Sequence, residues 1–142
     1  MSFIDPLLED IPCGCGFMLW NPIATSEFSR LGLYDDARFP GRCILRLNTH
    51  YDSFEELPAD VLMSFMADIQ SSMSAIRLAT GAARVNVAIL GNRDPHVHAH
   101  LIPRFPDEEQ FPDCSPWNDL RLNTNLPVNS RIAIMSAIWQ SL

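Results

Sequence analysis

A regular spacing of apolar residues dominates the stretch between positions 58 and 80. Apolar side chains recur there at steps of three or four, at Leu62, Phe65, Met66, Ile69, Met73 and Ile76. This period places them in one continuous stripe along a helix. Pro58 suits a first helical turn and Gly81 suits a C-terminal stop. The pattern predicts a helix about 35 Å long, at about 1.5 Å per residue, whose stripe packs in a core or a dimer contact.

Alternation with a period of two predicts strands on both sides of this helix. Residues 30–34 and 42–48 show this pattern, with a polar loop containing Pro and Gly between them. The apolar run 85–90 and the alternating residues 96–101 flank the turn sequence 91–94, which predicts an antiparallel hairpin. We therefore expect an α+β fold, in which one long helix packs on an antiparallel sheet.

The two ends of the chain have weaker patterns. Residues 1–29 carry apolar anchors among Pro and Gly, which predicts short turns wrapped on the sheet edge. Residues 104–118 are rich in Pro, acidic and aromatic residues and predict an ordered loop. Near the C terminus, Asn129 or Ser130 can cap a short helix. The apolar side of that helix would consist of Met135, Ile138, Trp139 and Leu142.

Size and composition predict one globular domain that spans residues 1–142. This length suffices for a domain with its own core, and 47% of the residues are apolar. No apolar run approaches the roughly 20 residues of a membrane span, and we infer no secretion signal. The cysteines do not have the spacing of a disulfide framework. We therefore expect a cytoplasmic protein with reduced thiols and no membrane partner.

The charge of the chain narrows the classes of partner. Nonspecific nucleic-acid binding needs a basic surface that displaces counterions from phosphates. The formal net charge of −7 therefore argues against a nucleic-acid partner. All ten basic side chains are arginines, so a lysine Schiff base and a Walker-type phosphate loop are excluded. A small anionic ligand is compatible with this composition, because local groups outweigh the global field in a pocket.

Three of the four histidines lie in the alternating segment 96–100. Alternate residues of a strand point to one face, so His96, His98 and His100 form a row of imidazoles. Next-but-one residues stand roughly 6.5 Å apart, which gives each ring its own place along a bound ligand. Neutral imidazole is both a nucleophile and an acid-base group near neutral pH. The row is therefore the candidate active site.

The pattern His-x-His-x-His, followed by two apolar residues and Pro-Arg, resembles the active-site motif of the histidine triad (HIT) family. Leu90-Gly91-Asn92, with Pro95 before the first histidine, is most similar to the small bacterial members of the family that resemble diadenosine polyphosphate hydrolases. Residues 34–41 and 43–47 resemble the family's nucleoside-side strand, loop and strand. The resemblance covers about residues 30–105 and leaves 106–142 as a C-terminal extension. It implies a HIT-like fold and a homodimer.

For function, the resemblance implies a nucleotide hydrolase or nucleotidyl transferase that forms a covalent nucleotidyl-histidine intermediate. The substrate would be a nucleoside phosphate or a dinucleoside polyphosphate. His98 would attack the α-phosphorus, while His96 would assist the leaving group and His100 would help fix the row. Asn92, or less directly Asn86, would donate to a phosphate oxygen, although a turn role explains Asn92 almost as well.

Other positions match the family less closely. Its members place a carboxylate or amide after the first matched strand to bind the ribose hydroxyls, and Asp35 is the nearest match with Asp36 second. Either aspartate also suits a turn without any ligand. Arg42 stands where many relatives carry a histidine after Pro-Gly. Trp117 is either a contact to a nucleotide site or an ordinary packing residue.

Two other functions are compatible with the histidine row. A metal-dependent hydrolase would use His96 and His98 as ligands, since His-x-His on a strand can supply two ligands to zinc. A nucleotide-binding regulator would keep the pocket without useful turnover. We assign no metal ligand and no required cofactor from the sequence, and Mg²⁺ can accompany the substrate phosphates.

A structural zinc is a separate question. Some HIT proteins hold zinc on N-terminal cysteines and a histidine after the second strand, and Cys13, Cys15 and His50 are the corresponding candidates. Those relatives usually show Cys-x-x-Cys, whereas one residue separates the two cysteines here. The sequence leaves this site open.

Overall fold

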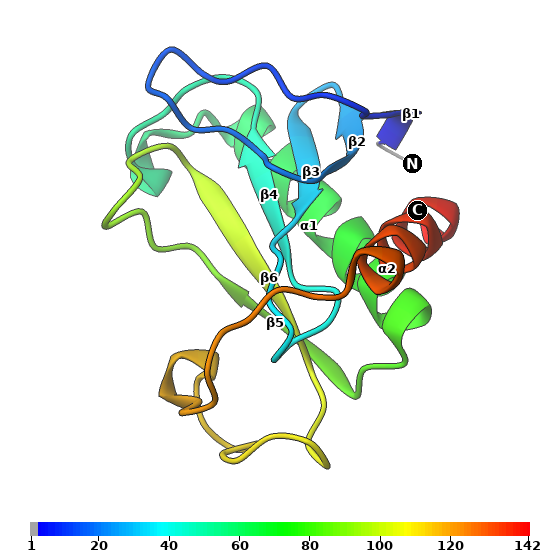
Figure 1. Ribbon diagram of the computed structural model, residues 1–142. Coiled ribbons are helices and arrows are strands. Elements are labelled where there is room, and N and C mark those ends of the chain that lie inside the picture. Colours follow the sequence, from blue (N-terminus) through cyan, green and yellow to red (C-terminus); the bar gives the residue numbers. More distant parts are fainter. Residues whose placement is uncertain (1–2) are drawn as a thin grey trace.

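An antiparallel sheet of six strands forms the centre of the computed structural model, which describes residues 3–142 (Figure 1). The strand order across the sheet is β1-β2-β3-β4-β6-β5, and each neighbouring pair is antiparallel. The strands are β1 (Phe3–Pro6), β2 (Pro22–Ser26), β3 (Ser29–Leu33), β4 (Cys43–Leu47), β5 (Arg84–Ala88) and β6 (His98–Arg104). The helices are α1 (Ala59–Thr80), α2 (Val128–Ser141) and the one-turn 3-10 helices η1 (Phe54–Glu56) and η2 (Pro116–Asn118). The predicted α+β fold is confirmed.

The long helix predicted from the apolar stripe is α1, which begins directly after Pro58. Gly81 ends it with a left-handed backbone, at φ 71°, and its N–H donates to the Arg77 carbonyl at 2.9 Å. Residues with a Cβ rarely adopt that φ, so glycine suits this stop. Within residues 3–142, no helix combines the length and the apolar character that crossing a membrane requires.

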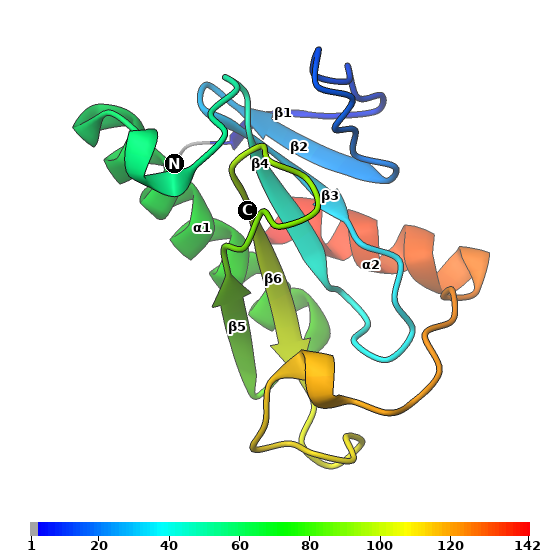
Figure 2. The same ribbon diagram turned by 90° about the vertical axis from the view of Figure 1, so that its left-hand side faces the viewer.

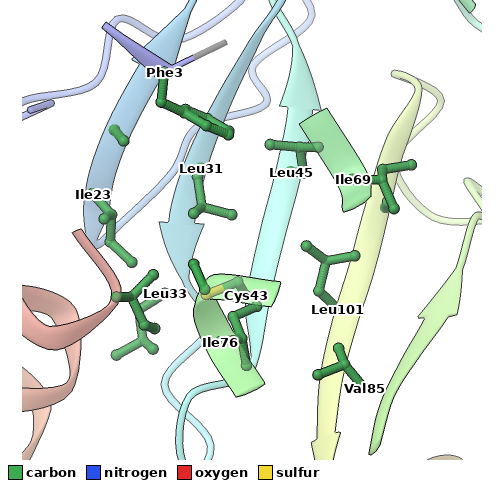
Figure 3. Packing of buried hydrophobic residues seen from close by; sticks show 14 of the residues in the cluster. Phe3, Ile23, Leu31, Leu33, Cys43, Leu45, Ile69, Ile76, Val85 and Leu101 are labelled. Carbon is green, nitrogen blue, oxygen red and sulfur yellow. The ribbon is translucent and has the colours of Figure 1, made fainter. Parts of the chain in front are cut away.

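The core lies between the sheet and the two longer helices, which cover the same face of the sheet (Figures 1 and 2). α1 packs against β6, α2 packs against β2, and the two helices contact each other. Alternate strand positions point into this layer, as the period of two predicts. Figure 3 shows Leu31, Leu45 and Leu101 of the strands in one layer with Ile69 and Ile76 of α1. The opposite face of β4 and β6 is left for polar side chains.

The N-terminal segment is more regular than its sequence pattern predicts. Short turns are expected for residues 1–29, but β1 and β2 lie there and extend the sheet beyond β3. A buried carboxylate explains the difference, because Asp68 of α1 accepts hydrogen bonds from Ser26 Oγ at 2.6 Å and Ser29 Oγ at 2.5 Å. These serines interrupt the apolar alternation, and only the folded helix supplies their acceptor.

The C-terminal helix begins earlier than predicted and is capped differently. Pro127 occupies the N-cap position of α2 without a side-chain hydrogen bond, so Asn129 and Ser130 lie inside the first turn. The predicted apolar side is confirmed by the residues that pack against the core, which are Met135, Ile138, Trp139 and Leu142. The expected loop 104–118 contains η2 near its end.

Candidate functional site

A cavity of about 990 Å³ lies over the polar face of β4 and β6, and His98 and His100 form part of its wall. The register of the sheet places them there, because His100 pairs with Ile44 and His98 pairs with Arg46 across β6 and β4. The intervening Ala99 points into the core. The remaining walls come from residues 16–21, the end of β3, the loop 90–94 and the C-terminal segment.

His98 has one ring nitrogen fixed and the other free. Its Nδ1 lies 2.7 Å from the backbone carbonyl oxygen of His96, and because a carbonyl only accepts, Nδ1 carries the ring proton. In the neutral ring with this tautomer the lone pair is on Nε2, which has no hydrogen-bond partner among residues 3–142. The ring of Phe17 packs over His98 with 4.8 Å between centroids. A neutral imidazole oriented in this way can act as a nucleophile through Nε2.

His100 lies beside His98, with 5.1 Å between ring centroids. Its Nδ1 is 3.2 Å from a terminal nitrogen of the Arg42 guanidinium. Burial, and then the charge of Arg42, lowers the pKa of His100 to about 4. The ring is therefore neutral at pH 7. Trp117 packs against it edge-on with 5.6 Å between centroids.

His96 departs from the row, because β6 begins at His98. The Leu47 N–H donates to the Val97 carbonyl at 3.2 Å, and the Val97 N–H donates to the Tyr51 carbonyl at 2.9 Å. This pairing with two other segments bends the chain before the strand starts. His96 is 1% exposed and does not line the cavity. The prediction that all three rings share one strand face is therefore wrong for His96.

Instead, His96 joins Cys13, Cys15 and His50 in a thiol-imidazole cluster whose potential ligand atoms all lie within 4.8 Å of one another. The Nδ1 atoms of His50 and His96 are 3.1 Å apart. Cys13 Sγ is 3.7 Å from His50 Nδ1, and Cys15 Sγ is 3.5 Å from His96 Nδ1. Tetrahedral zinc, with bonds of about 2.3 Å to sulfur and about 2.05 Å to nitrogen, spaces its ligand atoms about 3.4 to 3.8 Å apart. The cluster fits a structural zinc in composition and in size.

The outer ring nitrogens of the cluster support the same interpretation. His96 Nε2 lies 2.7 Å from the Leu47 carbonyl oxygen, and His50 Nε2 lies 2.6 Å from the Asp52 carboxylate. Each acceptor takes the ring proton, so both Nδ1 atoms carry lone pairs directed into the cluster, where a metal cation or protons from the two thiols can satisfy them. The bond to Asp52, followed by Cys13, raises the pKa of His50, whereas burial lowers the pKa of His96. These two directions favour a proton on His50 over a second proton on His96.

Sequence reasoning finds three members of this cluster and misses the fourth. The strand pattern assigns the His96 side chain to the row, and the bend that turns it toward the cysteines depends on contacts with Leu47 and Tyr51. A hydrogen bond from the Cys15 backbone is the main cause that lowers the pKa of the Cys13 thiol. A lowered thiol pKa favours the thiolate, which is the form that binds metal.

The two candidate ribose contacts have different surroundings. Asp35 borders the cavity, where its carboxylate accepts hydrogen bonds from Arg131 at 3.2 Å and from a backbone N–H at 2.8 Å. Asp36 is fully buried, and its Oδ2 binds Arg38 at 2.9 Å and Arg42 at 3.0 Å. Asp35 is thus placed to contact a ligand, whereas Asp36 can affect the site only through the arginines.

The two candidate phosphate donors, Asn92 and Asn86, also lie in different places. Asn92 lies with Arg93 in the loop that lines the cavity. Asn86 lies on β5, where its Oδ1 accepts a hydrogen bond from Arg104 at 2.6 Å, and it borders another cavity of about 600 Å³. The structure therefore brings Asn92 to the histidines and does not bring Asn86 there.

Several cavity residues carry no signal in the sequence. They are aromatic and amide side chains outside the segments that resemble the family: Phe17, Trp20, Asn21, Asn123 and Asn125. Figure 2 shows the C-terminal segment, in orange, passing the loop between β3 and β4, where the Ala37 N–H donates to the Thr124 carbonyl at 2.8 Å. Only the folded chain brings these segments together, although Trp117 is singled out by its position after the motif.

Comparison with known proteins agrees with the motif. The family model described as HIT domain matches residues 23–107, from β2 to just beyond β6. No curated protein matches the chain significantly in sequence.

Solved structures share the fold. A histidine triad (HIT) protein from Sinorhizobium meliloti 1021 has a TM-score of 0.77 at 23% identity, over 86% of this chain and 89% of that one. A histidine triad protein from Bradyrhizobium japonicum has a TM-score of 0.75 at 18% identity, over 99% and 98% of the two chains. A Zn-bound histidine triad family protein from Mycobacterium smegmatis has a TM-score of 0.60 at 19% identity, over 84% of each chain.

Proposed function

Since the chain belongs to the histidine triad (HIT) family, we propose that it is a nucleotide hydrolase or nucleotidyl transferase that works through a covalent intermediate on His98. HIT proteins generally act on nucleotides. The proposed substrate is a nucleoside phosphate or a dinucleoside polyphosphate. The observation that carries the proposal is the state of His98, whose Nδ1 proton is fixed on a carbonyl while Nε2 is free at the cavity wall.

The reaction has two steps at His98. In the first, Nε2 forms a bond to the α-phosphorus, and the bond from phosphorus to the leaving oxygen breaks. Because Nδ1 keeps its proton, the ring becomes cationic, and the His96 carbonyl at 2.7 Å stabilises that charge. In the second, water or another acceptor attacks the phosphorus and loses its proton to solvent, and the phosphorus-nitrogen bond breaks to restore neutral His98.

His96 takes a different part from the one that its motif position implies. Its side chain belongs to the thiol-imidazole cluster, while its backbone carbonyl holds His98. We propose that His96 orients the nucleophile through this carbonyl. Contacts to the phosphates then fall to the loop 90–94, where Asn92 is a neutral donor and Arg93 a cationic one.

The nucleoside part of the ligand is proposed to lie toward Asp35 and the C-terminal segment. Asp35 can accept a hydrogen bond from a ribose hydroxyl, since it is the cavity-facing carboxylate of the pair. Tyr34 and Trp117 offer aromatic surface on which a base can stack. The cavity volume of about 990 Å³ is at the upper end of the range for small-molecule pockets, which reaches about 1,000 Å³.

A metal-dependent hydrolase has less support. The residues that gather as potential ligands include His96 but not His98. Four protein ligands also leave a tetrahedral metal no open position for water or substrate. Because a relative is Zn-bound, we propose a structural zinc on the thiol-imidazole cluster, which departs from the assignment of no metal ligand. The reaction itself is still predicted to need no cofactor, with Mg²⁺ optional on the substrate phosphates.

A homodimer is proposed as the working state. The family resemblance implies it, and α1 exposes Met63 and Leu78 to 74% and 76% on its outer side. Light scattering at micromolar concentration should give twice the mass of 16.0 kDa. A monomer under those conditions would contradict the dimer while leaving the His98 chemistry intact.

The decisive experiment is capture of the intermediate. The protein is mixed with diadenosine polyphosphates or an adenylated substrate, quenched under mildly alkaline conditions during turnover, and analysed by intact-mass and peptide mass spectrometry. We expect a mass increase of one AMP unit on the peptide that contains His98. His98→Ala should abolish the adduct and turnover, whereas His98→Gly with added imidazole should restore part of the turnover.

Two outcomes would contradict the proposal. An active protein whose His98→Ala variant keeps near-normal turnover would end the covalent mechanism. Nucleotide binding without turnover across a nucleotide panel would favour the regulator instead. Chelator treatment alone is ambiguous, because Mg²⁺ on the substrate can assist either route, so the adduct itself is measured.

A further inference from the structure

Directly before β4, Arg42 lines the cavity next to His98 and His100, and the proposed mechanism does not yet use it. We propose that Arg42 is a positioning residue that holds His100 in the neutral tautomer with its proton on Nε2, so that His100 donates one hydrogen bond to the substrate. This inference rests on the proposed function for its consequence, but the tautomer itself can be measured without any substrate.

The contact between Arg42 and His100 specifies the tautomer. A terminal guanidinium nitrogen lies 3.2 Å from His100 Nδ1. A guanidinium has only donors, so Nδ1 must accept, and the neutral ring then carries its proton on Nε2. Among residues 3–142, Nε2 makes no hydrogen bond, and His100 borders the cavity. The donor is thus available to a phosphate oxygen or to the leaving group.

Arg42 is itself held firmly. Its other terminal nitrogen donates to Asp36 Oδ2 at 3.0 Å, and Asp36 is fully buried. The guanidinium carbon lies 4.0 Å from the centre of the Tyr34 ring and 5.5 Å from that of Trp117. Aromatic faces attract a guanidinium and restrict its tilt. Asp36, Tyr34 and Trp117 therefore hold the Arg42 guanidinium in place, and its N–H group donates to His100.

Charge explains why a fixed cation suits this place. Burial lowers the pKa of Arg42, but arginine stays protonated in proteins, and Asp36 balances its charge. The groups that face His100 are Arg42, His98 and the rings of Tyr34 and Trp117. A nearby cation disfavours a second charge on His100. His98 becomes cationic during the attack, and a neutral neighbour 5.1 Å away does not oppose that charge.

The geometry therefore divides the work between two adjacent rings. His98 keeps its proton on Nδ1 and reacts through Nε2. His100 accepts at Nδ1 and donates through Nε2. The donor role that the motif assigns to His96 passes to His100, because the His96 ring is committed to the thiol-imidazole cluster.

The test is a nitrogen-15 NMR titration of the full chain labelled at histidine. Two-bond proton-nitrogen correlations report the tautomer and the pKa of each ring, and His100→Gln identifies the His100 signals. In the unsubstituted protein we expect His100 to be protonated at Nε2 and unprotonated at Nδ1 near pH 7. In Arg42→Met, the Nε2 preference should be lost, and the pKa of His100 should rise toward the ordinary value of about 6.5.

Matched variants separate positioning from general damage. Arg38→Met removes a neighbouring arginine that binds Asp36 but does not touch His100, and it should leave the His100 tautomer unchanged. Arg42→Lys keeps the charge and a donor nitrogen, and should restore part of the Nε2 preference. In single-turnover assays, Arg42→Met should slow formation of the His98 adduct about tenfold to a hundredfold. Steady-state assays should show a smaller effect on KM than on kcat.

Each result decides the proposal. A His100 ring protonated at Nδ1 in the unsubstituted protein overturns it, even if every variant fails to fold. An unchanged tautomer and pKa in a folded Arg42→Met protein also overturns it. Failure of the proposed function is distinct, because an absent His98 adduct with the expected His100 tautomer would contradict the reaction and leave the Arg42 contact standing.

Discussion

Two buried arginines lie four residues apart, Arg46 on β4 and Arg42 directly before it, and they hold different parts of the candidate site. Arg46 binds Asp10 at 2.8 Å and the Phe17 carbonyl at 2.9 Å, which ties down the N-terminal segment that carries the cysteines. Arg42 binds Asp36 at 3.0 Å and reaches His100. Both residues are buried arginines, but Arg46 anchors a segment of the chain, whereas Arg42 contacts a histidine of the cavity.

His96 and His100, the first and last histidines of the motif, also differ in what they contact. Both nitrogens of His96 are committed, one to a carbonyl and one to the thiol-imidazole cluster. His100 has one nitrogen committed and one open to the cavity. The number of free nitrogens, more than position in the motif, decides which ring can take part in a reaction. His98, between them, also has one free nitrogen.

The largest effect should appear when His98→Ala is compared with His96→Ala. His98→Ala should lower turnover by at least about 10⁴-fold, as expected for loss of a nucleophile, with an unchanged melting temperature. His96→Ala should instead lower the melting temperature and metal content. Initial rates and differential scanning calorimetry on both proteins give the comparison, and equal stability losses in the two would remove the division of roles.

Removing and restoring zinc tests the thiol-imidazole cluster separately from the cavity. With free zinc at one hundred times its dissociation constant, binding stabilises a folded protein by about 2.7 kcal/mol, which corresponds to about 10 °C in melting temperature for this chain length. Zinc added to metal-free protein should produce a shift of that order. The Cys13→Ser, Cys15→Ser double variant should show none. A shift that survives in the double variant would place the metal elsewhere.

The cavity end should have its own pH signature. The pKa of His100 is about 4 in the folded state, below the unfolded value of about 6.5. Unfolded chains then bind the proton more strongly, so the stabilisation is complete above pH 6.5 and is lost as pH falls toward 4. After allowance for solvent screening, the loss should be about 2 kcal/mol.

His100→Gln provides the matched control for that signature. Urea unfolding at pH 7 and at pH 4.5 should show a smaller difference in the free energy of unfolding for this variant. The same pH dependence in both proteins would assign it to other groups.

The smallest effect concerns the ribose contact. Asp35→Ala should weaken binding of a ribonucleotide by about 1 to 3 kcal/mol, because a buried hydroxyl loses its acceptor. Binding of a 2′,3′-dideoxy analogue should change much less. Titration calorimetry with both ligands measures the difference. Equal losses would assign Asp35 to its contacts with Arg131 and the C-terminal segment.

Periodic segments were predictable from sequence because each depends mainly on its own spacing. The stripe in α1, the glycine that ends it and the β5–β6 hairpin follow from local pattern. β2 was not predictable, because Ser26 and Ser29 look like turn residues until Asp68 of α1 accepts their hydrogen bonds.

Within the site, the sequence predicted most of the residues that border the cavity but not the contacts that these residues make. His98, His100, Asn92 and Asp35 all border the cavity that the motif implies. His96 does not, because one bend fixed by distant backbone contacts turns its ring away. Arg42 was visible only as a departure from the residue that many relatives carry, and its contact with His100 exists only once β4 has paired with β6.

The thiol-imidazole cluster also constrains how this molecule is made. Cys15 and His96 are 81 positions apart, and such long-range contacts form late in folding because the intervening chain must be ordered first. On the ribosome, both thiols and His50 emerge long before His96 does. The cluster can therefore be completed only after His96 has been synthesised, so a nascent chain that ends before His96 lacks both the complete cluster and the proposed nucleophile His98.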